Sequence, residues 1–305
     1  MKSIKYWSVY RRMIGLINRF FPFLLAKARF RKLFGRRLDL KNPKDLNEKI
    51  LWLSLYSDTT MWSYCADKYA VRSYVKERGC EDCLVKLYGK WDKVEDISWD
   101  ELPQKFVIKP NNGVGMVLKV EDKSKLDVDE TKVLLERWLA IDVSCTNTEF
   151  HYQHIRPCII VEELLENSEQ DMQVSNSIID YKIWCFNGVP DSILVCSNRT
   201  SSGCCLSAFD MQWNYHPEVL VFGHGHDMSE TVIPKPKNYE RMLDIAATLS
   251  EGFPEVRVDL YNIGGRICFG ELTFTSLGGT MTYYTEAELL RMGGKVDISK
   301  AMKKQ

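Results

Sequence analysis

The stretch Val256-Arg257-Val258-Asp259-Leu260-Tyr261 decides the fold, together with Gly270-Glu271-Leu272-Thr273, whose glutamate lies twelve residues after the aspartate. The segment between them contains an asparagine and two adjacent glycines, so the pattern predicts two paired strands joined by a turn. Alternate side chains of a strand share a face, so Arg257 and Asp259 would lie together and Glu271 would approach from the neighbouring strand. Two carboxylates beside a guanidinium suit a magnesium-bound phosphate. A hairpin with a solvated charged face accounts for the same residues.

Length and composition indicate a soluble globular protein of one large domain or two to three small ones. The 305 residues carry no net charge, with 45% hydrophobic and 27% charged residues. No apolar run is long enough to cross a bilayer and no secretory signal is evident, which predicts a cytoplasmic protein with free thiols. Cys80-Glu81-Asp82-Cys83 lacks a second pair at zinc spacing, and His224-Gly225-His226 lacks a third ligand, so neither motif predicts a metal site.

The charge distribution is uneven at the N-terminus. Residues 1–37 hold eleven lysines and arginines, many aromatic side chains and no aspartate or glutamate. Such a basic, partly amphipathic segment is typical of a helix that lies on an anionic membrane surface. A helix that packs on the protein and leaves its cations in water explains the composition equally well. A nucleic-acid role is disfavoured, because the rest of the chain has no matching basic face.

A phosphate-binding turn is predicted in the first half of the chain, after helices predicted over 46–56 and 62–79. The strand Lys105-Phe106-Val107-Ile108-Lys109 leads into Pro110-Asn111-Asn112-Gly113-Val114-Gly115-Met116 and a returning strand. Backbone N–H groups of such a turn can wrap phosphate oxygens while Lys109 supplies a positive charge. No Gly-Lys-Ser/Thr and no helix follow, so this is not a Walker loop, and a plain hairpin turn is the alternative.

Two further segments place charged residues next to apolar strands. The strand over 157–161 ends in Glu162-Glu163-Leu164-Leu165, which suits either a linker that meets a purine edge or a charged turn. Further on, Asn187-Gly188 predicts a hairpin between two strands. Lys182 lies inside the first of these strands, where it must find an anion or reach solvent, and Arg199 follows the second as a candidate anion contact.

In this order the motifs resemble an ATP-grasp enzyme and, more narrowly, the TupA-like ATP-grasp family, which is named for a teichuronopeptide biosynthesis protein and is often found among surface-polysaccharide genes. The resemblance runs from about Asn42 to Gly279. No single motif is decisive, whereas six in the same order are specific. The six are Asp67-Lys68, Phe106 to Gly115, Val161-Glu162-Glu163-Leu164, Asp180 to Gly188, Arg257 to Tyr261 and Gly270 to Phe274.

The resemblance implies an α+β ATP-grasp fold in which two α+β lobes clamp ATP, preceded here by a helical basic segment. We expect residues 1–40 to form that basic amphipathic segment and 41–100 a helical substrate region. Residues 101–165 would form the small subdomain with the phosphate flap, 166–293 the large subdomain with the metal site, and 294–305 a tail.

The family pattern also implies roles for the matching residues. ATP would be bound by Lys68, Lys109, Asn111, Asn112, Gly113, Gly115, Glu162, Glu163, Leu165, Glu169 and Lys182. Within that set, Glu162 would meet the adenine amino group, the backbone of Glu163 and Leu165 the adenine edge, and Glu169 the ribose. Lys182 would reach the γ-phosphate and Arg257 would steady the transferred phosphate, as the catalytic residues.

The same pattern implies a metal site at Asp259, Glu271 and Thr273 for Mg²⁺, with Mn²⁺ as an alternative ion. The superfamily usually has asparagine two residues after the metal glutamate, and this chain has Thr273 there. A threonine hydroxyl ligates magnesium in P-loop enzymes but reaches less far than an amide. The position therefore puts the second magnesium ion in question.

The implied activity is that of an ATP-dependent carboxylate–amine ligase. ATP would phosphorylate a carboxylate, and an amine would displace phosphate from the acyl phosphate. The substrates would be an amino acid or peptide and a uronic acid or similar group, on a lipid-linked glycan for the capsule or another cell-envelope polysaccharide. The enzyme would be cytoplasmic or peripheral on the inner face of the cell membrane. A glycosyltransferase and an ATP-dependent kinase acting on a polysaccharide precursor are the alternative transferases, and a non-catalytic binding module is a further class.

Overall fold

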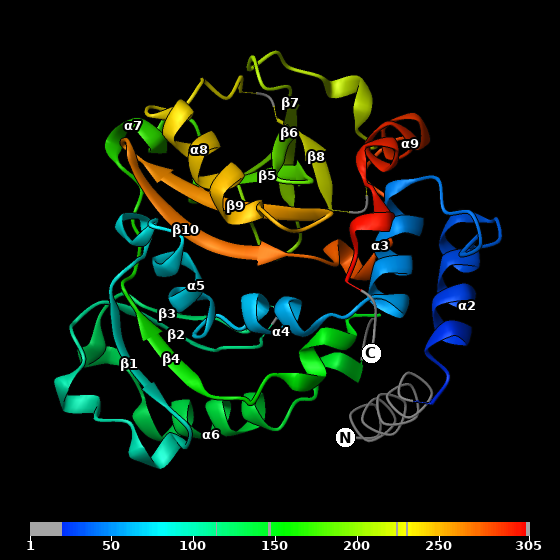
Figure 1. Ribbon diagram of the computed structural model, residues 1–305. Helices are drawn as coiled ribbons and strands as arrows, with labels where there is room; N and C mark the ends of the chain where they lie inside the picture. The colour runs from blue at the N-terminus through cyan, green and yellow to red at the C-terminus, as the bar shows by residue number, and fades with distance from the viewer. Residues whose placement is uncertain (1–19, 114, 146–147, 224, 230, 303–305) are drawn as a thin grey trace. The chain divides into compact units, whose positions relative to one another are not determined.

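The computed structural model describes residues 20–113, 115–145, 148–223, 225–229 and 231–302, and Figure 1 labels the helices and strands. The chain forms two compact units. The larger unit contains Met1–Thr59, Cys145–Phe150 and Asn167–Gln305, and the smaller unit contains Thr60–Ser144 and His151–Glu166. These bounds differ from the predicted segments, because residues 41–59 pack with the C-terminal half of the chain rather than with 60–100. Among the described residues, no helix is long and apolar enough to cross a membrane.

The smaller unit is built on a four-stranded antiparallel sheet with the order β1-β4-β2-β3. The strands are β1 (Leu87–Trp91), β2 (Phe106–Pro110), β3 (Leu118–Val120) and β4 (Ile159–Glu162). Burial alternates along β2, where Phe106 and Ile108 are fully buried, whereas all four residues of β4 are buried. The strand predicted at Lys105 to Lys109 is thus confirmed, with a shift of one residue. Lys109 lies on its less buried face.

Three α-helices belong to the smaller unit: α4 (Thr60–Ala66), α5 (Val71–Glu77) and α6 (Val128–Leu139). The prediction of a single helix over 62–79 is wrong, because α4 and α5 are separate helices. The Asp67 carboxylate accepts hydrogen bonds from the N–H groups of Tyr69 and Ala70 at 2.8 and 3.2 Å, which turns the chain between α4 and α5. Lys68 therefore lies in a turn. Short 3₁₀ helices lie at Glu81–Cys83, Val94–Asp96, Trp99–Glu101, Lys123–Lys125, Val143–Cys145 and Phe150–His154.

The larger unit is built on a six-stranded sheet with the order β10-β9-β5-β6-β7-β8 (Figure 1). The strands are β5 (Asp180–Phe186), β6 (Val189–Ser197), β7 (Cys204–Phe209), β8 (His226–Met228), β9 (Glu255–Ile263) and β10 (Arg266–Thr273). β7 and β8 are parallel and all other neighbours are antiparallel. Both predicted hairpins are confirmed. Asn187 and Gly188 have φ of 53° and 83°, and Gly264 and Gly265 have φ of 60° and 105°, as two-residue turns require.

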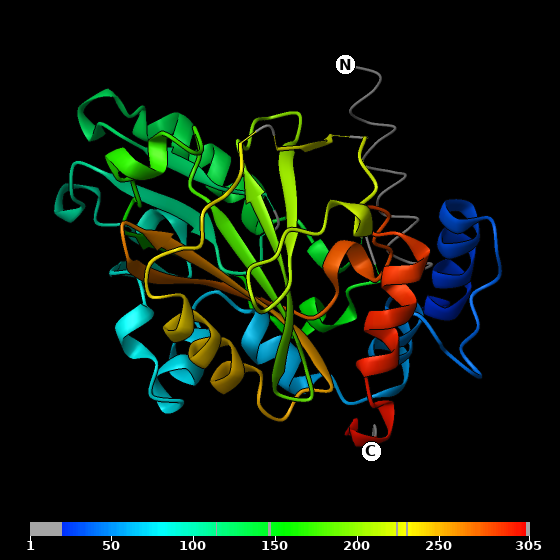
Figure 2. The ribbon, with the colours of Figure 1, turned by 90° about the horizontal axis from the view of Figure 1, so that it is seen from above.

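Helix α8 (Tyr239–Ser250) covers one face of this sheet, as Figures 1 and 2 show, and contacts β5, β6 and β9. Its apolar side chains Ile245 and Leu249 are fully buried. The thiol of Cys185 donates to the carbonyl oxygen of Ala246 at 3.7 Å, so Cys185 faces α8. Because side chains alternate along a strand, Lys182 and its cross-strand neighbours lie on the opposite face. That face carries the charged residues.

The remaining helices of the larger unit are α2 (Pro22–Phe34), α3 (Leu46–Tyr56), α7 (Glu169–Met172) and α9 (Glu286–Lys295), with 3₁₀ helices at Pro217–Val219, Ser276–Gly278 and Ile298–Lys300. The helix predicted over 46–56 is confirmed as α3. Asp45 caps it by accepting from the Glu48 N–H. The predicted tail is packed on the unit as far as it is described, because Val296 is buried and Asp58 N–H donates to the Met302 carbonyl oxygen at 2.8 Å.

Candidate active site

Charged residues of β5, β9 and β10 come together on the sheet face opposite α8. Lys182 pairs directly with Asp259 across β5 and β9, and Glu271 pairs with Asp259 across β9 and β10. A β-bulge at Gly270 shifts the register between these last two strands. A Cβ atom at Gly270 would lie 2.9 Å from the Asp259 carbonyl oxygen, so glycine allows the close approach. The bulge is what sets Glu271 opposite Asp259.

Asp259 is buried, and both of its carboxylate oxygens accept hydrogen bonds from cations. Oδ1 lies 2.7 Å from Arg257 Nε, while Oδ2 lies 2.7 Å from Arg257 Nη2 and 2.6 Å from Lys182 Nζ. Burial alone would raise the pKa of this carboxyl group, but Arg257 and Lys182 outweigh burial and lower the pKa of Asp259. Asp259 is therefore an ionised carboxylate held in place by two cations.

Asp180 completes the charged cluster, which we define as Asp180, Lys182, Arg257 and Asp259. Its Oδ2 lies 2.6 Å from Lys182 Nζ and 3.3 Å from Arg199 Nη2. Its Oδ1 is buried and has no hydrogen-bond partner among the described residues. Burial raises the pKa of Asp180, against the effect of Lys182. Sequence reasoning did not single out Asp180 as a site residue, although its spacing of two from Lys182 places both on one face of a strand.

The carboxylates of Asp180 and Asp259 also keep Lys182 and Arg257 protonated. Burial would lower the pKa of Lys182, but Asp180 and Asp259 outweigh burial and raise it. In the same way, Asp259 outweighs burial and raises the pKa of Arg257. The two side chains therefore stay protonated although they are almost fully buried.

Arg257 is also held from the segment that follows β10. Its Nη1 donates to Ser276 Oγ at 2.6 Å, and its Nη2 donates to Thr273 Oγ1 at 3.2 Å. The guanidinium carbon lies 5.7 Å from the ring centroid of Trp184, whose indole N–H donates to Tyr284 Oη at 3.0 Å. With every side of the guanidinium in contact, Arg257 presents its charge from a fixed position.

Three side chains offer oxygen atoms to a metal ion at this place. Asp259 and Glu271 contribute carboxylates, and the Thr273 hydroxyl lies 3.4 Å from Glu271 Oε1. Within the described part of the chain, no group of three or more histidines, cysteines, aspartates or glutamates forms a metal-binding cluster. Hard oxygen ligands of this kind fit Mg²⁺, with water or phosphate oxygens filling the remaining positions. A site of two carboxylates and one hydroxyl suits a metal ion that is bound together with a phosphate.

In the smaller unit, Glu162 at the end of β4 holds two cations. Its Oε2 lies 2.6 Å from Lys109 Nζ, and its Oε1 lies 3.0 Å from Arg72 Nη1. Arg72 also donates to the carbonyl oxygen of Val85 at 2.7 Å. Glu162 is buried, and its ion pairs with Lys109 and Arg72 compensate the three charges. Sequence reasoning missed Arg72, because a lone arginine on a short helix carries no local signal of its partner.

The turn after β2 is anchored by side chains. Asn111 is buried; its Nδ2 donates to the Arg156 carbonyl oxygen at 3.1 Å, and its Oδ1 accepts from Cys158 N–H at 2.9 Å. Lys68 Nζ donates to the Gly113 carbonyl oxygen at 3.0 Å. The side chain of Asn111 is therefore structural, because both ends of its amide are bonded within the protein. Val114, in the middle of the predicted flap, lies outside the described residues.

Of the other predicted residues, Glu163 lies in the smaller unit and Glu169 in the larger unit. Glu163 N–H donates to the Lys86 carbonyl oxygen at 2.9 Å and so extends the pairing of β1 and β4. Glu169 is exposed at the start of α7 in the larger unit. The Cys83 thiol donates to the Cys80 carbonyl oxygen at 2.9 Å, which supports a structural role for that motif. His226 lies in β8, and its predicted neighbour His224 lies outside the described residues.

These features fit one class of protein, the ATP-grasp enzymes: a small antiparallel sheet with Lys109 and a glycine-bearing turn, and a larger sheet that carries buried acids and cations. The chain belongs to the TupA-like ATPgrasp family, whose model matches residues 48–295. This membership confirms the predicted family and the α+β ATP-grasp fold class. It places the chain in the class of ATP-dependent carboxylate–amine ligases. No curated protein matches the chain in sequence.

Solved structures show a distant likeness to this chain. D-alanine–D-alanine ligase from Bacillus anthracis is 17% identical over 79% of this chain and 70% of its own, with a TM-score of 0.46. D-cycloserine synthetase DcsG is 12% identical over 78% of this chain and 71% of its own, with a TM-score of 0.45. The ATP-grasp ligase PsnB in complex with a minimal precursor is 10% identical over 79% and 62%, with a TM-score of 0.41.

Proposed function

We propose that this protein uses ATP to activate a carboxylate as an acyl phosphate and then joins it to an amine. The observation that carries the proposal is the charged cluster beside Glu271 and Thr273, in a member of the ATP-grasp family. Two buried cations and two acids in contact suit the handling of phosphate and metal together. The product would be an amide, with ADP and phosphate released.

Asp259, Glu271 and Thr273 would hold Mg²⁺, or Mn²⁺ in its place. When bound, the metal would offset the negative charge of the phosphate oxygens. Lys182 would turn from the carboxylates to a phosphate oxygen, because the phosphate brings more negative charge than either acid alone. Arg257, fixed by Ser276 and Thr273, would stabilise the group in transfer.

In the smaller unit, Lys109 and the backbone of the turn from Asn111 to Gly115 would contact the phosphates. Arg72 would add a second cation beside Lys109, since both share Glu162. Lys109 and Arg72 occupy both oxygens of the Glu162 carboxylate, so an adenine amino group would bind there only after displacing one of these cations. The remaining proposed nucleotide contacts are Lys68, Asn112, Glu163, Leu165 and Glu169.

We propose that the acid is a uronic acid or similar group on a lipid-linked glycan and that the amine is an amino acid or peptide. The family name, with its link to teichuronopeptide synthesis, supports this choice. The glycan would be a precursor of a bacterial capsule or another cell-envelope polysaccharide, modified on the cytoplasmic face of the membrane. Arg199 is half-exposed and fixed by Asp180, so it would bind the substrate anion next to Lys182.

A glycosyltransferase that uses a sugar nucleotide is the runner-up. Such enzymes commonly bind their metal through an Asp-x-Asp sequence, and Asp127-Val128-Asp129 occurs in this chain. Asp127 caps α6 by accepting from Glu130 N–H, and the side chain of Asp129 is 96% exposed at the first turn. The structure thus explains this sequence as a helix start. A kinase is the other alternative, and it would release no free phosphate.

The test is a screen of purified protein with magnesium ATP against uronic acids combined with amino acids. We expect ADP and free phosphate in equal amounts, only when an acid and an amine are both present. Asp259→Asn should abolish this release, and Asp129→Asn should leave it unchanged as the matched control. ADP without phosphate would establish a kinase, and turnover of a sugar nucleotide without ATP would establish a glycosyltransferase. Either result overturns the ligase proposal.

A further inference from the structure

Large apolar side chains are exposed to solvent where helix α2 begins. Phe20 and Phe21, which precede the helix, and Leu24 in its first turn are 66%, 61% and 63% exposed, although a soluble protein normally covers such a group. The opposite face of the helix is buried: Ala26 and Phe30 pack into a cluster with Leu38, Leu40, Leu51 and Leu55. The exposed face is therefore not the one that holds α2 on the larger unit.

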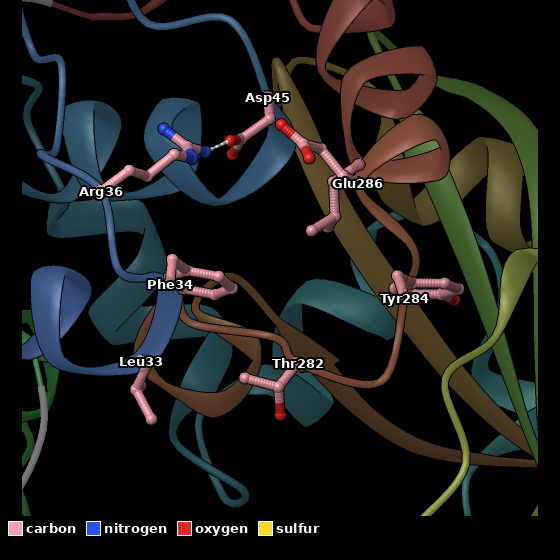
Figure 3. A pocket seen from close by; sticks show the side chains of 8 residues that line it. Leu33, Phe34, Arg36, Asp45, Thr282, Tyr284 and Glu286 are labelled. Carbon is pink, nitrogen blue, oxygen red and sulfur yellow. Dashed lines mark hydrogen bonds and ion pairs between the residues drawn. The ribbon is translucent and has the colours of Figure 1, made fainter.

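The orientation of this face is fixed by the segment that follows α2. Gly35 ends the helix with a φ of 68° and its N–H donates to the Arg31 carbonyl oxygen. Arg36 then pairs with Asp45 and, at 2.5 Å, with Glu48. Figure 3 shows Arg36 directed at Asp45 on one side of a pocket of about 240 Å³. The helix face and its end are therefore both held on the larger unit, while Phe20, Phe21 and Leu24 are exposed to solvent.

Cations follow the apolar residues along the same helix. Lys27, Arg31 and Lys32 are exposed, and Lys27 and Arg31 lie about one and two turns beyond Leu24. The ion pairs of the described residues include none of these three cations, and residues 1–38 contain no acidic residue at all. The exposed face of α2 therefore has an apolar end and a positive end.

We propose that this face, defined as Phe20, Phe21, Leu24, Lys27, Arg31 and Lys32, docks on an anionic lipid bilayer. The phenylalanines and the leucine would enter the boundary between headgroups and acyl chains, where apolar groups leave water. The cations would meet the phosphate and carboxylate groups of the lipids. A second copy of the chain fits poorly, because like charges would face each other, and a nucleic acid would leave the apolar side chains without contacts.

Docking on a bilayer does not depend on catalysis, so this proposal can be tested separately from the ligase proposal. It would bring the larger unit, which carries the charged cluster, to the surface that holds lipid-linked substrates. Because apolar contact and charge both contribute, binding should weaken with salt but should not vanish. Each exposed cation should add about fivefold to the partition coefficient on anionic vesicles.

The test is co-sedimentation of the full-length protein with vesicles of phosphatidylcholine alone or with about a third phosphatidylserine (our choice of probe). We expect the partition coefficient to be at least tenfold higher on the anionic vesicles than on phosphatidylcholine alone. The variant Phe20→Ser/Phe21→Ser/Leu24→Ser and the variant Lys27→Glu/Arg31→Glu/Lys32→Glu should each lower the partition coefficient at least tenfold. Unchanged circular dichroism and melting temperature would show that both variants fold.

Matched controls alter the same kinds of residue elsewhere. Val189→Ser/Val232→Ser removes apolar side chains that are 64% and 79% exposed, and Lys93→Glu/Lys125→Glu/Arg156→Glu reverses three exposed cations. Both controls should bind like the wild type. Wild-type protein that stays in the supernatant with anionic vesicles overturns the proposal, as does equal loss of binding in the controls. Loss of a dimer in the apolar variant, without vesicle binding by the wild type, would identify a second copy as the partner instead.

Discussion

Lys182 Nζ lies 2.6 Å from Asp259 Oδ2, and the two residues face each other directly across β5 and β9. The lysine proposed to meet phosphate is therefore paired with the acid proposed to hold the metal. Arg257 contacts the same carboxylate through two nitrogen atoms. A metal ion and a phosphate arriving together would leave the charges balanced, because Lys182 would move from Asp259 to the phosphate and the metal would offset the charge of Asp259. Either one alone would leave a buried charge uncompensated.

Removing the lysine should lower stability as well as activity, because Asp180 and Asp259 would lose a buried cation. We expect Lys182→Met to lower ATP-dependent phosphate release by a factor of about 10² to 10³, the usual cost of losing one group that stabilises charge in the transition state. Lys235→Met removes a half-exposed lysine of the same unit and should stay within twofold of the wild type. The measurement is kcat with saturating ATP. A Lys182→Met enzyme with normal kcat would remove this residue from the mechanism.

Thr273 should affect the Mg²⁺ concentration that the enzyme requires. Thr273→Val keeps the shape of the side chain but removes the hydroxyl that accepts from Arg257 and lies near Glu271. We expect the Mg²⁺ concentration for half-maximal activity to rise about tenfold, in the range typical for groups that support metal ligands. Thr273→Asn restores a longer oxygen ligand and should return that concentration to the wild-type value or below. Equal magnesium dependence in all three proteins would exclude Thr273 from the metal site.

The pairing of Glu162 with Lys109 and Arg72 should stabilise the smaller unit. Glu162→Gln leaves two largely buried cations without their acid, and breaking a buried ion pair typically costs about 3–5 kcal/mol. Glu166→Gln breaks an exposed pair with Lys105 at 2.7 Å, which solvent screens, and should cost much less. Urea unfolding at neutral pH compares the two. A similar small loss in both variants would show that the Glu162 charges are solvated.

Glu255 should make stability depend on pH. It is fully buried, neither carboxylate oxygen has a hydrogen-bond partner among the described residues, and burial raises the pKa of Glu255 well above its usual value. The unfolded chain releases this proton above about pH 4.3 whereas the folded chain keeps it, so the free energy of unfolding falls by at most about 1.4 kcal/mol per pH unit above that pH. The effect ends once pH passes the raised pKa of the folded state.

The variant Glu255→Gln cannot ionise and should lack this dependence. Its stability advantage over the wild type should grow as pH rises from 5 to 8, as measured by urea midpoints. Glu251→Gln, at an exposed position four residues earlier, should follow the wild type at every pH. A constant difference between Glu255→Gln and the wild type across this range would mean that Glu255 is ionised in the folded protein.

Local sequence predicted those parts of the fold that neighbouring residues control. Asn187-Gly188 and the glycines at 264–265 adopt positive φ, which few other residues do, so both hairpins could be found from the sequence. The same reasoning failed at Asp67. Its side chain accepts hydrogen bonds from the backbone N–H groups of Tyr69 and Ala70 and so ends one helix, although the surrounding apolar pattern suits a longer helix.

The sequence by itself determined the family, the two hairpins and the residue types of the candidate site, since these depend on motif order and turn chemistry. Only the tertiary structure decided which charges meet. Lys182 and Asp259 are 77 residues apart, and Arg72 and Glu162 are 90 apart. Strand register and burial bring such residues into contact, and burial is also what leaves Asp180 and Glu255 with unpaired oxygens. The local hairpin pattern predicted Arg257, Asp259 and Glu271 side by side, whereas Lys182 and Asp180 joined Asp259 only through the pairing of β5 with β9.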